Sequence, residues 1–245
     1  MIWEALKRPL EAGLGFFYPQ VCQLCGLTRA TAAEGYVCAG CRAGARPVQP
    51  PWCECCGRPY PGAITAAFVC GVCQEEKRYF VSARSAVVFE GPVREALHRY
   101  KYQRALWFEP FFAGLLQAGI PAGFDPGAWD CLAPVPLHRV KLAEREFNQA
   151  ERLGRELCRL TGIRMNTRLL RRLHHTRTQT QLTREERTAN VRNAFGLKRG
   201  VRLTGERVLL FDDVMTTGAT TNECARILLQ GGASTVGVWT LARGT

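Results

Sequence analysis

Two adjacent carboxylates and a hydroxyl-rich turn occur close together near the end of the sequence. In VLLFDDVMTTGATT (208–221), four apolar residues precede Asp212 and Asp213, and a turn of threonine, glycine and alanine follows. Neighbouring acids at the end of a buried strand repel each other, but they suit hydrogen bonds to the vicinal hydroxyls of a sugar. The turn can direct backbone N–H groups onto a phosphate. An ordinary threonine-capped turn leaves the acids unexplained, so we expect a sugar-phosphate site here.

The cysteines are the second group with chemical spacing. Nine of the 12 lie between positions 22 and 73, and eight of these form four C-x-x-C pairs. A C-x-x-C turn points two thiolates at one tetrahedral ion, and a second such turn completes a four-cysteine zinc site. The pairs predict two structural zinc sites, with ligands Cys22, Cys25, Cys38 and Cys41 in the first and Cys53, Cys56, Cys70 and Cys73 in the second.

Two alternatives accompany this zinc assignment. Cys55 competes with Cys53 as a ligand, and Cys53 is preferred because it keeps the two-residue spacing. Disulfides are the alternative to zinc, but charged residues recur through the first eleven positions, so no signal-peptide apolar core fits. Disulfides are rare in the reducing interior of the cell. No apolar run approaches the roughly 20 residues of a membrane span, so we expect a cytoplasmic protein without a transmembrane segment.

Strands alternating with helices must position these residues. Past residue 80 the cysteines thin out and longer periodic patterns begin. Strand patterns cover 81–91, 129–137, 207–214 and 234–242, and helical patterns cover 92–102, 148–162 and 222–232. This alternation predicts an open, mostly parallel α/β sheet whose ligands bind beyond the carboxyl ends of its strands. We expect two domains, an N-terminal helix with a double zinc ribbon at 1–80 and the α/β domain at 81–245.

Positive charge is concentrated in one third of the chain. The formal net charge is +12, and residues 138–207 alone hold 18 Lys and Arg against 7 Asp and Glu. Such a stretch predicts a polyanionic partner, which fits the phosphates of a small molecule, nucleic acid or anionic lipid. A solvated basic surface that aids solubility is the alternative.

The motifs also resemble known families. FDDVMTTGATT resembles the 5-phosphoribosyl-1-pyrophosphate (PRPP) motif of type I phosphoribosyltransferases. The order of double zinc ribbon, PVPL…R…FNQA, Q…L…ER..NVRNAF and PRPP motif is similar to the ComF family over nearly the whole chain. The resemblance implies a type I phosphoribosyltransferase-like parallel sheet with a small N-terminal zinc-ribbon domain. It implies that Asp212 and Asp213 bind the ribose. It assigns the 5′-phosphate to Thr216, Thr217, Gly218, Ala219 and Thr220.

The two middle motifs imply further binding segments. PVPLHRVKLAEREFNQA matches the family's pyrophosphate loop, and a pyrophosphate with Mg²⁺ needs cationic and amide donors. The donors at this loop are Arg139, Lys141, Arg145 and Gln149. Glu146 stands where family members usually have glycine. The polar segment 174–195 matches the flexible loop that closes over the site. Its matching positions are Gln181, Arg187 and Asn190.

Three functions fit these residues. The first, implied by the resemblance, is a PRPP-binding protein of natural transformation that handles single-stranded DNA at the cytoplasmic side of the inner membrane with a helicase partner. The second is an active phosphoribosyltransferase acting on a nitrogen acceptor, although no acceptor-recognition motif and no catalytic residue is identified. The third is a zinc-stapled scaffold for partner proteins.

Two apolar features bear on these partners. Tyr100, Tyr102, Phe147 and Phe195 would offer stacking faces to DNA bases, although aromatics at such spacing are more often core residues. The opening helix carries an apolar stripe from Ile2 to Leu14. Docking of this helix on the domain is favoured over peripheral membrane contact, because only two of its residues are basic.

Overall fold

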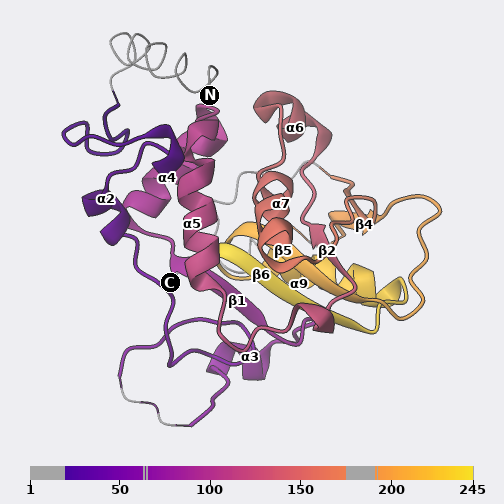
Figure 1. The fold of residues 1–245 in the computed structure, drawn as a ribbon. Coiled ribbons are helices and arrows are strands. Elements are labelled where there is room, and N and C mark those ends of the chain that lie inside the picture. The colour runs from indigo at the N-terminus through magenta and orange to yellow at the C-terminus, as the bar shows by residue number, and fades with distance from the viewer. Residues whose placement is uncertain (1–19, 63, 65, 175–190, 192, 245) are drawn as a thin grey trace.

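A four-stranded parallel sheet forms the centre of the molecule (Figure 1). The computed structural model describes residues 20–62, 64, 66–174, 191 and 193–244. The sheet has the order β1-β6-β5-β2, with β1 at Ala83–Val88, β2 at Cys131–Pro134, β5 at Arg207–Met215 and β6 at Thr235–Arg243. All three pairings are parallel, so the predicted fold class is confirmed. The expected opening helix and the positions Gln181, Arg187 and Asn190 lie outside the described residues.

Helices cover both faces of this sheet. The longer helices are α4 (Gly91–Tyr102), α5 (Glu109–Gly119), α7 (Gln149–Thr161) and α9 (Ala219–Gln230). The connection β1–α5–β2 and the connection β5–α9–β6 run in opposite directions across the sheet, and right-handed crossovers then place their helices on opposite faces. Helix α7 packs beside α5 and against β2 and β5.

Short elements complete the chain and shape its loops. They are η1 (Ala32–Glu34), α2 (Ala39–Ala43), α3 (Gly71–Glu75), η2 (Leu106–Phe108), η3 (Pro126–Ala128), α6 (Arg139–Arg145), and the antiparallel pair β3 (Leu170–Arg172) and β4 (Phe195–Leu197). Within the described ranges, no helix combines the length and apolar character needed to cross a bilayer.

Helix α7 shows how the sequence sets these elements. Asn148 caps its first turn, because its side-chain oxygen accepts a hydrogen bond from the backbone N–H of Ala150 at 3.0 Å. Gly162 ends the helix with a positive φ of 78°. Leu153 and Leu157 are fully buried on the face that meets the sheet. The observed helix is therefore the amphipathic segment predicted at 148–162.

The zinc-ribbon segment packs directly on the sheet. Residues 46–48 run along the free edge of β1, where the Val48 N–H donates to the Ala86 carbonyl at 3.0 Å and the Val88 N–H donates to the Arg46 carbonyl at 2.8 Å. This pairing covers an edge that would otherwise expose unpaired backbone groups. Several buried residues of the ribbon, such as Val37 and Cys53, belong to the same core cluster as the sheet, so part of the described ribbon shares its packing with the sheet.

Candidate functional site

A cleft of about 280 Å³ lies at the carboxyl ends of β2 and β5. It gathers all of the predicted PRPP-binding residues, which are Asp212, Asp213, Thr216, Thr217, Gly218, Ala219 and Thr220. Lys141, Arg145 and Gln149 of the predicted pyrophosphate segment line the same cleft. Arg139 begins α6, is exposed, and is not among the lining residues.

The turn after β5 is built around Gly218. This residue has a φ of 79° and caps α9, and a Cβ atom there would lie 2.6 Å from the Met215 Cε atom. Glycine is therefore required by the backbone conformation, while the close atom is the terminal methyl of the flexible Met215 side chain. The turn places the N-terminus of the 12-residue helix α9 at the cleft, where its orphan N–H groups and its dipole favour an anion.

The two acids differ in their electrostatic surroundings. Asp213 is 8% exposed and forms an ion pair with Lys101, and its backbone N–H donates to Asp212 Oδ1 at 2.9 Å. Burial, and then the adjacent charge of Asp213, raise the pKa of Asp212 well above its ordinary value. Burial also opposes ionisation of Asp213, but the charge of Lys101 lowers its pKa overall. Asp213 therefore ionises more readily than Asp212.

Lys101 and Arg172 are site residues that sequence reasoning missed. Lys101 lies in the last turn of α4, and Arg172 ends β3 with its guanidinium 5.2 Å from the centre of the Phe195 ring. Both line the cleft. Neither occurs in a motif, and each reaches the acids only through packing of distant segments, so no local signal marks them.

The pyrophosphate segment is arranged by α6 and the start of α7. The Lys141 Nζ atom forms an ion pair with Glu144 at 2.7 Å, and the Arg145 guanidinium lies 5.0 Å from the centre of the Tyr102 ring. Gln149 is 2% exposed, and its Oε1 atom has no hydrogen-bond partner among the described residues. An unsatisfied buried oxygen is costly, so a donor from a bound ligand is favoured at this position.

Glu146 occupies a position that suits glycine. It ends α6 with a φ of 66°, and its carboxylate forms an ion pair with Arg104 at 2.8 Å. A non-glycine residue in this left-handed conformation costs about 1–2 kcal/mol. The glycine that the resemblance implies at this position suits this backbone conformation, which Glu146 adopts here at that cost.

Two of the four candidate stacking aromatics are buried in the core. Tyr100 is fully buried, its hydroxyl donates to Glu109 Oε1 at 2.7 Å, and Phe147 packs edge-on against it. Phe195 is 2% exposed. The stacking interpretation is therefore wrong for Tyr100 and Phe195, while Tyr102 is 51% exposed.

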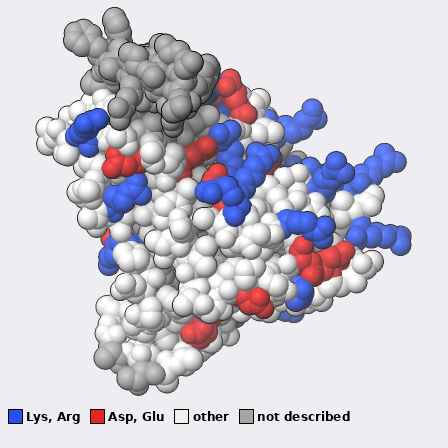
Figure 2. All heavy atoms as spheres, viewed as in Figure 1, with Lys and Arg blue, Asp and Glu red and all other residues white. Residues whose placement is uncertain are grey.

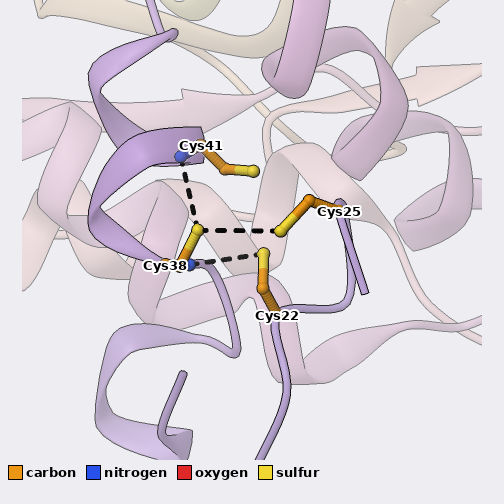
Figure 3. Close-up of side chains that lie close together, drawn as sticks. All are labelled: Cys22, Cys25, Cys38 and Cys41. Atoms are coloured by element: carbon orange, nitrogen blue, oxygen red, sulfur yellow. Dashed lines mark hydrogen bonds between the residues drawn. The ribbon is translucent and has the colours of Figure 1, made fainter. Parts of the chain in front are cut away.

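The eight predicted cysteines form two clusters, each with its four sulfur atoms within 4.8 Å of one another. The Cys25 and Cys38 sulfurs lie 3.9 Å apart (Figure 3), and those of Cys56 and Cys70 lie 3.8 Å apart. A tetrahedral zinc ion with Zn–S bonds of about 2.3 Å requires sulfur separations of about 3.8 Å. The second cluster contains Cys53 and not Cys55.

Backbone N–H groups support the sulfurs in the same way in both clusters. The N–H of Cys38 points at the Cys22 sulfur over 3.4 Å, and the N–H of Cys70 points at the Cys53 sulfur over 3.3 Å. None of the twelve cysteines, all of which lie in the described ranges, forms a disulfide. The residues present therefore fit two structural four-cysteine zinc sites.

The chain is similar to a known domain family and to several known proteins. The double zinc ribbon domain family matches residues 13–76. The chain is 31% identical over 228 residues to the DNA utilization protein YhgH of Salmonella typhimurium, covering 92% of this chain and 97% of that protein. It is 29% identical to Competence protein F of Haemophilus influenzae, covering 86% and 92% of the two chains. It is 28% identical to Competence protein ComFC of Bacillus subtilis, covering 84% of each.

The sheet, the cleft and the ribbon thus define a zinc-ribbon α/β protein. The chain belongs to the ComF family of competence and DNA utilization proteins. Among solved structures, the allosteric regulatory enzyme of purine biosynthesis aligns with 53% of this chain and 24% of its own, at 25% identity and a TM-score of 0.32. A score this low does not define a common fold, and the fold class rests on the sheet topology.

Proposed function

We propose that this protein binds PRPP with Mg²⁺ in the cleft at the carboxyl ends of β2 and β5. One observation carries the proposal: an acid pair and the glycine turn that follows it at a helix N-terminus line one cleft together with a basic segment that is distant in sequence. Each offers the chemistry that one part of PRPP needs. The acids suit the ribose hydroxyls, the turn suits the 5′-phosphate, and the basic segment suits the pyrophosphate.

The roles follow from the geometry of the lining residues. Lys101 lowers the pKa of Asp213 and so keeps one acceptor ionised for the sugar. Lys141 and Arg145 supply positive charge, and the Gln149 side chain supplies a buried amide. When bound, Mg²⁺ neutralises charge on the pyrophosphate oxygens.

Thermal unfolding with and without Mg²⁺ and PRPP tests this binding. A ligand at 100 times its dissociation constant adds about 2.7 kcal/mol, which raises Tm by about 5–10 °C for a chain of this size. We expect Asp212→Asn/Asp213→Asn to lose the shift. The control Glu151→Gln/Glu156→Gln also removes two carboxylates, but these lie on α7 outside the cleft lining, and it should keep the shift. No shift of the wild type at millimolar PRPP would contradict the proposal.

We also propose that single-stranded DNA is handled on the exposed arginines in the described part of residues 138–207, on the cytoplasmic side of the inner membrane. In Figure 2, Lys and Arg side chains are most numerous on the right of the face in view, and others lie on its left. Arg139, Arg164, Arg168 and Arg171 are exposed and form no ion pair within the described ranges. The names of the relatives, with "competence" and "DNA utilization", support this proposal.

The salt dependence of DNA binding tests this second proposal. Each phosphate contact to a single strand contributes about −0.7 to the slope of log affinity against log salt. Fluorescence anisotropy with a labelled thymidine oligonucleotide should give a steep slope, and Arg164→Gln/Arg168→Gln should reduce its magnitude by about 1.4. Arg46→Gln/Arg94→Gln makes the same charge change outside residues 138–207 and should leave the slope unchanged. Salt-independent binding, or none, would overturn the idea.

A further inference from the structure

A single buried arginine connects the second zinc cluster to the turn that follows β5. Arg243, the last residue of β6, is 3% exposed. Its Nη1 atom donates to the backbone carbonyls of Met215 at 2.8 Å and of Thr216. Its Nη2 atom lies 3.9 Å from the sulfur of Cys56. One guanidinium therefore contacts both a zinc ligand and the beginning of the proposed phosphate turn.

The negative charge of the second zinc cluster explains why the charged Arg243 side chain is buried here. Four thiolates around one divalent ion carry a net charge of −2, and a guanidinium buried without a counter-charge is strongly unfavourable. The second cluster supplies that counter-charge. A small cavity of about 130 Å³ is lined by Cys56, Cys70, Arg243 and Thr216 together, so the ribbon and the turn pack against each other.

A second arginine acts on the same turn from the ribbon side. The Arg78 side chain is 5% exposed and forms an ion pair with Glu76 at 3.0 Å. Its Nη1 atom donates to the Thr217 carbonyl at 3.5 Å. In a trans peptide unit the N–H points opposite to the C=O. Holding the carbonyls of Met215 to Thr217 toward the arginines thus turns the N–H groups that follow them toward the cleft.

The first zinc cluster provides an internal comparison. Arg42 follows Cys41 directly, donates to the Glu34 carbonyl at 2.9 Å, and lies 5.2 Å from the centre of the Phe111 ring. It too is an arginine beside a zinc ligand that holds a backbone carbonyl. Its contacts are with η1 and α5, and it does not line the cleft.

We propose that Arg243 is a positioning residue through which the second zinc site sets the affinity of the turn for phosphate. The inference rests on the proposed binding of PRPP. Loss of the second zinc removes the partner that holds Arg243, and the carbonyls of Met215 and Thr216 then lose their fixed donor. Because coupling between two sites is reciprocal, bound PRPP must also hold the second zinc more tightly.

Zinc release from the wild-type full chain tests this coupling without any substitution. The chelator 4-(2-pyridylazo)resorcinol is added with Mg²⁺ held constant, with and without PRPP. Coupling between sites is typically about 5- to 150-fold. We therefore expect one of the two zinc equivalents to be held at least about five-fold more tightly against the chelator at equilibrium when PRPP is bound, and the other to be unaffected. The Asp212→Asn/Asp213→Asn protein should show no protection. Retention of both zincs that is the same with and without PRPP, with PRPP demonstrably bound, would overturn the proposal.

A matched pair of substitutions tests whether Arg243 is the residue that couples the two sites. Arg243→Lys keeps the charge but loses the planar fork that reaches Cys56 and the carbonyls together. By titration calorimetry it should bind PRPP at least about five-fold more weakly, and it should lose the zinc protection. Arg42→Lys should change neither. Unfolding without ligand and the zinc content of each variant confirm that it is folded and loaded.

The outcomes separate this inference from the function on which it rests. A wild type that does not bind PRPP overturns the proposed function. A wild type that binds PRPP while folded Arg243→Lys binds equally well overturns only the role of Arg243. If Arg243→Lys fails to fold, the zinc-release experiment on the wild type decides.

Discussion

The two zinc clusters have the same local construction but different surroundings. In each cluster, a glycine with positive φ follows the second cysteine of the first C-x-x-C pair. These glycines are Gly26, with a φ of 69°, and Gly57, with a φ of 65°. The first cluster has a small core of its own around Cys22, Ala30 and Cys38. The second belongs to the main core and lies against the turn after β5. A shared motif therefore does not imply a shared role, because the role depends on what each cluster packs against.

The largest difference between the two clusters should appear when one cysteine ligand is removed from each of them in turn. Cys38 and Cys70 are equally buried, at 4% and 5% exposure, and both begin the second half of a ribbon. Structural zinc contributes about 10 kcal/mol or more of folding free energy. We expect Cys70→Ser to lower the Tm of the sheet by about 10 °C or more, and Cys38→Ser by about 4 °C or less.

Calorimetry together with zinc analysis measures this difference. Each variant should retain one zinc equivalent, which controls for loss of the whole ribbon. Equal losses of Tm would show that the position of a cluster relative to the sheet does not matter.

The two knuckle glycines allow a finer comparison. A Cβ atom at Gly57 would lie 2.3 Å from the Ala83 carbonyl oxygen, whereas one at Gly26 would have no atom within 4 Å. Both substitutions to alanine cost about 1–2 kcal/mol because of the left-handed backbone. Gly57→Ala should cost about 1–3 kcal/mol more, since backbone of β1 must shift. Urea unfolding measures the difference, and equal costs would contradict the close approach of ribbon and sheet.

The sequence indicated the elements whose signal is local. The apolar run before Asp212 predicted β5, and the cysteine spacing predicted both clusters, because each depends on neighbours along the chain. The strand expected at 129–137 is shorter, Cys131–Pro134. Gly40 and Gly71, which lie within the second cysteine pair of each cluster, do not share the positive φ of Gly26 and Gly57. They lie in α2 and α3, where an ordinary helical backbone replaces the tight turn.

The sequence did not predict the residues that contact the site from distant parts of the chain. Lys101 pairs with Asp213 from a helix more than one hundred residues earlier in the chain. Arg243 contacts Cys56 from the far end of the sequence. In an apolar strand such as β6, a terminal arginine is indistinguishable from a solvated strand end. Only the packed structure shows that it is buried against a zinc ligand.

The strand order has a consequence for the order of folding. β6 follows β1, β2 and β5 in sequence, yet it lies between β1 and β5 in the sheet. During synthesis from the N-terminus, β1 therefore has no strand partner within this sheet until residues 235–243 have emerged. All ligands of both zinc clusters are synthesised much earlier. Residues 46–48 can then pair with the outer edge of β1 while the edge that β6 will occupy is still unpaired. The ribbon thus covers one edge of a sheet that is still incomplete, and the contact between Arg243 and Cys56 forms only once β6 has been added.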